Sequence, residues 1–133
     1  LGVEVRIACP KGFEPNPFIV EKAKKLNTNN KKIMITNDIN QALNNANVLY
    51  TDVWTSMGEE ENKDLKDIKF KDFNLNEKSL RSASENAIVL HCLPAYRGKE
   101  ITDEIMESEQ SRIFEQAENR MHVQQALLAC MLA

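Results

Sequence analysis

The sequence predicts an α/β domain built on a doubly wound, mostly parallel sheet flanked by helices. Two observations lead to this fold class. Short apolar segments typical of strands alternate with helical segments along the whole chain, an order that favours parallel strands joined by right-handed crossovers. The chain also has 133 residues, of which 42% are apolar, and this suits one compact domain, residues 1–133, with a core of its own.

The first strand and the first helix are marked by their ends. Residues 3–9 alternate apolar and polar side chains, as a strand does, and a turn at residues 10–12 ends this segment. Asn16 and Pro17 are the residue types preferred at the N-cap and the first position of a helix, and apolar residues then recur at helical spacing up to Leu26. We therefore expect a strand followed by an amphipathic helix.

The middle of the chain repeats this order. Residues 32–36 predict a second strand, Asp38 predicts the N-cap of a second helix, and residues 48–52 predict a third strand. Ser56 and Glu59 fit the S-x-x-E pattern of a capping box, which would start a third helix. Capping alone thus accounts for these two polar residues.

The last third of the chain completes the alternation. Asn76 is a suitable N-cap for a further helix, and residues 87–92 predict a fourth strand. Thr102 is a suitable N-cap for a short helix. Residues 111–115 predict a weak fifth strand, and residues 117–132 predict a long closing helix.

Composition excludes several classes of protein. The net charge is −3 and there is no basic stripe, so nucleic acid is not an expected partner. No segment reaches the roughly 18 apolar residues of a membrane span, so we expect no membrane insertion. Cys9, Cys92 and Cys130 lack paired spacing, which favours free thiols and a cytoplasmic location. A strand starts almost directly after Leu1, so we expect that an upstream part is missing.

The predicted fold indicates where a ligand would bind. In open α/β sheets, ligands bind in the crevice outside the carboxyl ends of the strands. Three segments are expected there, namely residues 52–58, 91–94 and 118–120. A carboxylate at a strand end, such as Asp52, needs a hydrogen-bonding or cationic partner unless it is well solvated. Asp52 is therefore a candidate functional residue.

Other polar residues in these segments have simpler explanations. Cys92 after an apolar strand is more often an inert buried thiol, and Pro94 is more often a strand stop. Arg120, in the first turn of the expected closing helix, would face the positive end of the helix dipole, which nearby glutamates or an anionic ligand would offset. His91 and His122 lack a third metal ligand at usable spacing, so we expect structural or surface histidines and no metal site.

Three separated motifs, taken together, point to one family. "DVWTSMGEE", "HCLPAYRG" and "IFEQAENR", in this order and spacing, closely resemble the ornithine carbamoyltransferases of the transcarbamoylase family. The resemblance runs over essentially the whole chain, from "VRIACPKG" to the last helix. It implies a Rossmann-like second domain, the ornithine-binding half of such an enzyme.

The resemblance also implies roles for individual residues. Asp52 would receive the α-ammonium group of ornithine, and the small loop at residues 56–58 would let its backbone and hydroxyl groups approach the substrate closely. The Leu93–Pro94 peptide bond would be cis. The implied site residues are Asp52, Ser56 and Met57 for ornithine, and Cys92, Leu93 and Arg120 for carbamoyl phosphate, with Cys92 and Arg120 as the catalytic residues.

The implied reaction transfers the carbamoyl group of carbamoyl phosphate to the δ-amine of L-ornithine, giving L-citrulline and phosphate in arginine or urea-cycle metabolism. The resemblance implies no cofactor, and it implies a homotrimer or larger assembly with active sites between neighbouring subunits. Carbamoyl phosphate is already activated and no base is paired with Cys92, so we expect this thiol to position the amine rather than to act as a covalent nucleophile.

The chain departs from the family in its length. No segment matches the phosphate-binding Ser-Thr-Arg-Thr-Arg motif or the Asp-Gly-Asn-Asn stretch of the family, so we expect a C-terminal piece without useful activity alone. Two alternatives remain open. One is a related transcarbamoylase with acetylornithine, a diamine or aspartate as the acceptor, and the other is a non-catalytic α/β binding module, because a fold alone does not fix a function.

Overall fold

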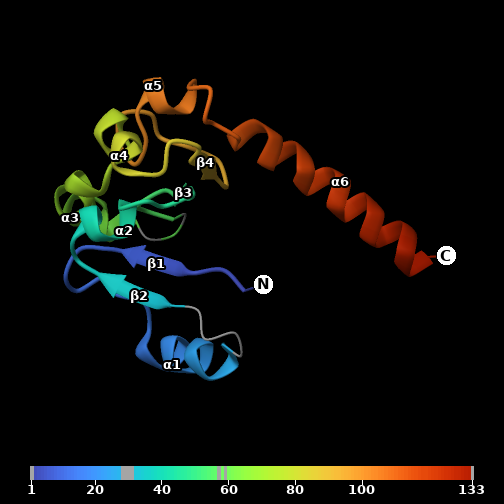
Figure 1. Ribbon diagram of the computed structural model, residues 1–133, viewed down its shortest axis with the longest axis horizontal. Helices are drawn as coiled ribbons and strands as arrows, with labels where there is room; N and C mark the ends of the chain where they lie inside the picture. Colours follow the sequence, from blue (N-terminus) through green and yellow to red (C-terminus); the bar gives the residue numbers. More distant parts are fainter. Residues whose placement is uncertain (1, 28–31, 57, 59, 133) are drawn as a thin grey trace.

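The computed structural model describes residues 2–27, 32–56, 58 and 60–132 (Figure 1). Strands and helices alternate along the chain, and the α/β fold class is confirmed. The strands are β1 (Val5–Ala8), β2 (Ile33–Thr36), β3 (Val48–Thr51) and β4 (Ile88–His91). The helices are α1 (Pro17–Leu26), α2 (Ile39–Leu43), α3 (Lys63–Phe70), α4 (Glu77–Ser82), α5 (Asp103–Met106) and α6 (Ile113–Leu132), and short 3₁₀ turns η1 (Glu60–Asn62) and η2 (Lys71–Phe73) flank α3.

The strands pair in parallel, as the sequence predicts. β1 pairs with β2, with Val5 opposite Ile33, and β3 pairs with β4, with Val48 opposite Ile88. Within the described residues these are two separate two-stranded ladders rather than one continuous sheet. Because the strands of each pair run in the same direction, the carboxyl ends of β3 and β4 lie side by side.

Three predicted helix caps are confirmed. The side chains of Asn16, Asp38 and Asn76 each accept a hydrogen bond from a backbone N–H in the first turn that follows, at 2.9, 2.9 and 3.1 Å. The predicted cap at Thr102 is only partly correct. Helix α5 begins directly after this residue, but its side chain makes no capping hydrogen bond.

The predicted fifth strand is wrong. Ser111 forms only an isolated parallel bridge with Val89. The chain then turns into α6, because the backbone N–H of Gln116 donates to the carbonyl of Arg112 at 2.9 Å and closes a helical turn. Helix α6 therefore begins at Ile113, four residues before the predicted start.

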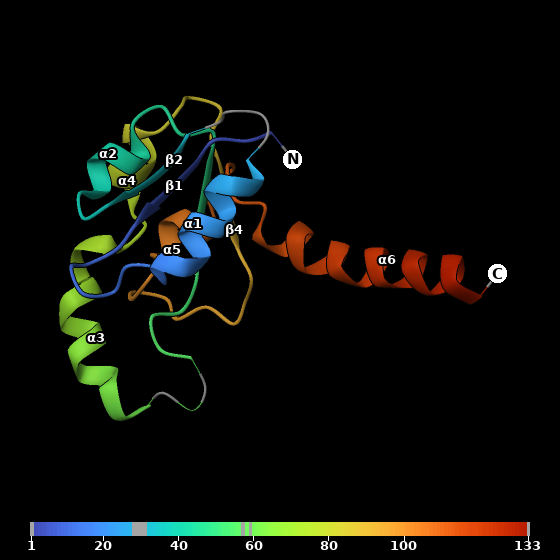
Figure 2. The same cartoon turned by 90° about the horizontal axis from the view of Figure 1, so that it is seen from below.

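The hydrophobic core lies around the β3–β4 pair. Helices α2, α4 and α5 and the first residue of α6 cover this pair, whereas α1 has no buried residue. Figure 2 shows α2 and α4 next to each other. The buried core residues are Leu43, Leu49, Leu75, Val89, Ile101, Ile105, Met106 and Ile113.

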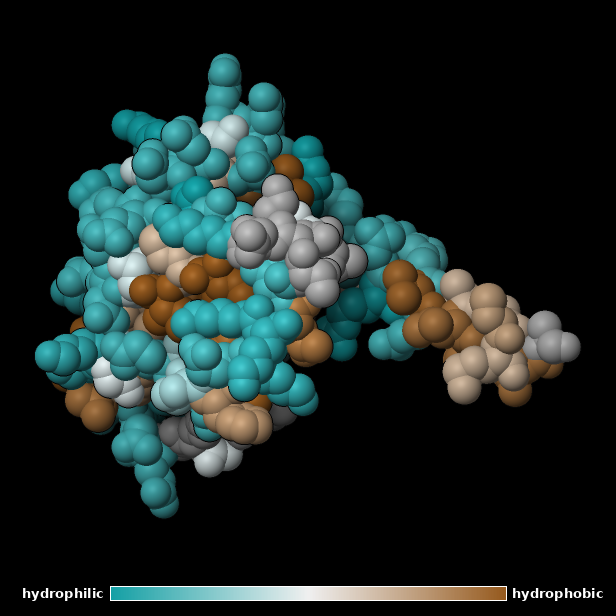
Figure 3. All heavy atoms as spheres, turned by 60° about the horizontal axis from the view of Figure 1, so that its bottom comes forward, coloured by the Kyte–Doolittle hydropathy of each residue, from teal (hydrophilic) through white to brown (hydrophobic). Residues whose placement is uncertain are grey.

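The far part of α6 stands clear of the body (Figure 3). The exposed fractions of its apolar side chains rise from 57% at Val123 to 84% at Leu132. None of the helices in the described part of the chain is long and apolar enough to cross a membrane.

Candidate active site

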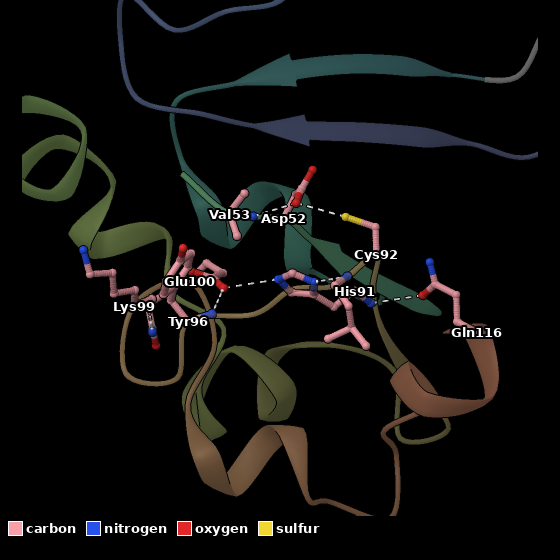
Figure 4. Close-up of polar contacts among 10 residues, drawn as sticks. Asp52, Val53, His91, Cys92, Tyr96, Lys99, Glu100 and Gln116 are labelled. Atoms are coloured by element: carbon pink, nitrogen blue, oxygen red, sulfur yellow. Dashed lines mark hydrogen bonds and ion pairs between the residues drawn. The ribbon is translucent and has the colours of Figure 1, made fainter. Parts of the chain in front are cut away.

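The two segments that leave β3 and β4 meet at Asp52 and Cys92 (Figure 4). The Cys92 thiol donates to Asp52 Oδ1 at 3.0 Å, and the backbone N–H of Val53 donates to the same oxygen at 2.7 Å. Asp52 Oδ2 has no hydrogen-bond partner among the described residues, and the residue is exposed. The structure therefore brings two predicted site residues together and leaves one carboxylate oxygen open to a ligand.

The surroundings of Cys92 favour the neutral thiol. Burial raises the pKa of this thiol, and the hydrogen bond to Asp52 and its negative charge raise the pKa further. Tyr50 has a smaller opposing effect on the pKa. A thiol that keeps its proton is a weak nucleophile. This agrees with the expectation that Cys92 positions a substrate rather than attacks it.

The turn after β4 has an unusual backbone. The Leu93–Pro94 peptide bond is cis, which confirms that prediction. Leu93 has a φ of 56°, in the left-handed region that non-glycine residues seldom adopt. Such a conformation costs on the order of 1–3 kcal/mol and persists only where the surrounding structure holds it. The backbone N–H of Leu93 donates to His91 Nδ1 at 2.8 Å, which provides part of this support.

Gln116 is a residue of this region that sequence reasoning missed. Its Oε1 accepts a hydrogen bond from the backbone N–H of His91 at 3.1 Å, and its Nε2 donates to the Tyr50 hydroxyl at 3.1 Å. The side chain of Gln116 thus links α6 to β3 and β4 next to the turn. It lies within the "IFEQAENR" motif, which was the available signal.

Arg120 reaches the same turn from α6. Its Nη1 donates to the Cys92 carbonyl at 3.4 Å, and its side chain is exposed. The predicted position in the first helical turn is wrong, because α6 begins at Ile113, seven residues earlier. Arg120 is therefore about two turns into the helix, where the dipole at the N-terminus has little effect.

The loop after β3 places Ser56 apart from these three residues. Trp54 stacks on Phe70 of α3, with ring centroids 6.1 Å apart, and fixes the base of the loop. Ser56 is exposed and lines a cavity of about 160 Å³ beside α3, and no recorded contact among the described residues joins it to Asp52 or Cys92. Met57 and the capping partner Glu59 lie outside the described residues, so their predicted roles stay predictions.

Neither ring nitrogen of His91 is free to bind a metal ion at this site. Asp52, His91 and Cys92 offer ligand atoms within 4.8 Å of one another, a grouping that the sequence did not suggest. However, His91 Nδ1 already accepts from the Leu93 N–H, and Nε2 lies 3.2 Å from Glu100 Oε1. Both ring nitrogens are therefore engaged, as is typical of a structural histidine, and the predicted absence of a metal site stays a prediction.

Fold and site together define an α/β domain of the Rossmann-like class, with polar groups gathered at the carboxyl ends of parallel strands. Residues 1–131 match the family described as "Aspartate/ornithine carbamoyltransferase, Asp/Orn binding domain". The chain belongs to this family.

Individual relatives agree with this assignment. The ornithine carbamoyltransferase of Prochlorococcus marinus subsp. pastoris is 60% identical over 132 residues, which cover 99% of this chain and 43% of that protein. The anabolic ornithine carbamoyltransferase of Campylobacter jejuni superposes with a TM-score of 0.90 at 44% identity, covering 96% of this chain and 43% of the other. The enzyme of Pyrococcus furiosus gives 0.87 at 36% identity, covering 96% and 41%. The chain thus spans less than half the length of these relatives.

Proposed function

We propose that the chain is the ornithine-binding part of an ornithine carbamoyltransferase. The observation that carries this proposal is the convergence of Asp52, Cys92 and Arg120, through contacts of 3.0 and 3.4 Å, at the carboxyl ends of β3 and β4. The family of the chain and its identity to enzymes of this name support the same function. The catalytic unit would include a further domain, because the matched relatives are more than twice as long.

The reaction joins the neutral δ-amine of ornithine to the carbonyl carbon of carbamoyl phosphate. A C–N bond forms, the C–O bond to phosphate breaks, and the amine loses one proton. Asp52 Oδ2 would pair with the α-ammonium group of ornithine and would hold the amino acid in place. The neutral Cys92 thiol and the Leu93 carbonyl would line the path of the δ-amine. Arg120 would stabilise the oxyanion of the tetrahedral intermediate and the departing phosphate.

The setting of the enzyme is part of the same proposal. We infer a cytoplasmic enzyme, in keeping with the unpaired thiols Cys9, Cys92 and Cys130, and a homotrimer that needs no cofactor. The far part of α6 exposes a row of apolar side chains, which suits a chain that is packed against further protein. The anabolic direction, toward citrulline, is the one for which the relative from Campylobacter jejuni is named.

A substrate panel tests the proposal. The chain, joined to the remainder of its gene, is assayed for phosphate release from carbamoyl phosphate with ornithine, acetylornithine, a linear diamine and aspartate as acceptors. We expect turnover with ornithine and at least tenfold lower kcat/KM with the other acceptors, since each one alters or lacks the α-ammonium, the α-carboxylate or the δ-amine. Turnover with another acceptor alone would identify a related transcarbamoylase, and none at all would support the non-catalytic module.

A further inference from the structure

A buried carboxyl group lies behind the turn that carries Cys92. Glu100 is fully buried, and its Oε1 accepts the backbone N–H of Tyr96 at 2.5 Å and lies 3.2 Å from His91 Nε2. Figure 4 shows the carboxyl group and the imidazole pointing toward each other. Its Oε2 is also buried and has no hydrogen-bond partner among the described residues, which is costly, so the presence of this carboxyl group calls for a reason beyond filling the core.

The hydrogen bonds of His91 determine its tautomer. The Leu93 N–H can only donate, so His91 Nδ1 must be the unprotonated acceptor, and the ring proton of the neutral imidazole is on Nε2. This proton points at Glu100 Oε1. Glu100 therefore selects the tautomer that can accept the Leu93 N–H. In the other neutral tautomer, the proton on Nδ1 would point at the Leu93 N–H, and the hydrogen bond could not form.

His91 holds one peptide unit, Cys92–Leu93, that is part of the candidate site. The Leu93 N–H and the Cys92 carbonyl belong to the same rigid peptide unit. Its N–H is held by His91, and its carbonyl oxygen accepts from Arg120 at 3.4 Å. Turning this plane would move the Arg120 partner, the direction of the Cys92 thiol and the Leu93 carbonyl together.

We propose that Glu100 is a positioning residue for carbamoyl transfer, which acts through His91 to hold the Cys92–Leu93 peptide plane and so sets the partner of Arg120. The inference rests on the proposed function of the same site. It extends the chain of interacting groups to a buried residue that touches neither substrate.

Two substitutions of His91 separate its contact with Glu100 from its contact with the Leu93 N–H. Asparagine places an amide oxygen near the position of Nδ1, so His91→Asn keeps an acceptor for the Leu93 N–H and loses Glu100. Glutamine places its amide near Nε2, so His91→Gln keeps the contact with Glu100 and loses the acceptor. Each variant is compared with the wild type in the complete enzyme, by thermal unfolding and by steady-state kinetics with ornithine and carbamoyl phosphate.

If Glu100 acts through His91, the two His91 variants should rank in opposite orders by Tm and by kcat. We expect His91→Gln to have the higher Tm of the two but to lose kcat on the order of tenfold relative to His91→Asn, the rate equivalent of one misplaced hydrogen bond. Glu100→Met should lower kcat, and Glu100→Gln, which keeps one acceptor oxygen, should restore part of it. The matched control is Glu107→Gln, which removes an exposed 2.6 Å ion pair with Arg97 of the same loop and should leave kcat unchanged.

The outcomes distinguish the inference from the proposed function. A wild-type enzyme that forms no citrulline would refute the proposed function. An active wild type in which kcat simply follows Tm across the two His91 variants would overturn the inference alone and would make Glu100 a core-stabilising residue. If Glu100→Met does not fold, the His91 pair still decides the question, because each member keeps one of the two contacts.

Discussion

The turns that follow β3 and β4 are built in different ways. The β4 turn is held from below by buried or half-buried polar side chains, with His91, Glu100 and Gln116 each engaged in hydrogen bonds. The β3 loop is fixed at its base by Asp52 and Trp54, and Ser56 and Gly58 beyond them are exposed. Precise chemistry needs groups on rigid supports, whereas a substrate needs an opening. In keeping with the proposed function, we expect the reaction centre at the β4 turn and the acceptor at the β3 loop.

The largest expected effect concerns the residue that contacts the rigid turn from α6. In the complete enzyme, Arg120→Gln should lower kcat on the order of 10²–10³-fold, because it removes a preorganised donor to the oxyanion. Arg120→Lys should restore little, since an ammonium group lacks the planar fork of a guanidinium group. Steady-state kinetics on both variants checks this.

Thermal unfolding provides the control for Arg120. The side chain is exposed and its hydrogen bond to the Cys92 carbonyl is long, so Arg120→Gln should change the free energy of unfolding by less than about 0.5 kcal/mol. A variant that unfolds much earlier but turns over normally would make Arg120 a structural residue and would remove it from the site.

The next effect concerns the carboxylate of the open loop. Asp52→Asn should raise the KM for ornithine by about 10- to 150-fold, the equivalent of the 1.5–3 kcal/mol of one charge-assisted hydrogen bond. The physical reason is that a neutral amide would replace the carboxylate that is proposed to pair with the α-ammonium group. Initial-rate kinetics measures it, and an unchanged KM for ornithine would show that Asp52 serves only the Cys92 thiol.

The pH dependence of Cys92 alkylation tests the contact between Cys92 and Asp52. Burial and Asp52 raise the pKa of Cys92, so its reactive thiolate form should appear only at a pH above the usual thiol range. Alkylation by iodoacetamide, followed by peptide mass spectrometry, should be slow at neutral pH and should accelerate above that range. Asp52→Asn removes the negative charge and the acceptor, so the pKa should fall and alkylation at a given pH should be faster. Equal rates in both proteins would contradict the contact.

The smallest effect is expected at the exposed end of the β3 loop. Ser56→Ala should raise the KM for ornithine only about two- to tenfold, since a neutral hydrogen bond is worth about 0.5–1.5 kcal/mol. Its kcat should be nearly unchanged. A variant that instead weakens carbamoyl phosphate binding would place Ser56 on the other side of the reaction centre.

Local patterns predict much of this fold. The caps at Asn16, Asp38 and Asn76 and the four strands follow from capping chemistry and hydrophobic periodicity, which act over a few residues. The strand predicted at residues 111–115 does not form, because two adjacent apolar residues, Ile113 and Phe114, fit a strand or a helix equally well. The helix therefore starts four residues before the predicted position, and Arg120 lies too far from its N-terminus for the expected dipole effect.

The candidate site divides in a similar way. Asp52, Cys92 and Arg120 could be predicted because they lie at strand ends or in recognisable motifs. Glu100 could not, since a single glutamate between Lys99 and Ile101 carries no periodic signal, and its burial depends on the fold as a whole. Side chains that support a site from behind are specified by tertiary contacts, which a sequence pattern does not show.

The most direct test of the division between the two turns is a matrix of initial rates for Asp52→Asn and Arg120→Gln, measured over both substrates in the complete enzyme. We expect each variant to affect a different substrate. Asp52→Asn should raise the KM for ornithine and leave that for carbamoyl phosphate near the wild-type value, whereas Arg120→Gln should lower kcat and weaken carbamoyl phosphate. If both variants weaken the binding of both substrates to the same degree, the two turns do not have separate roles.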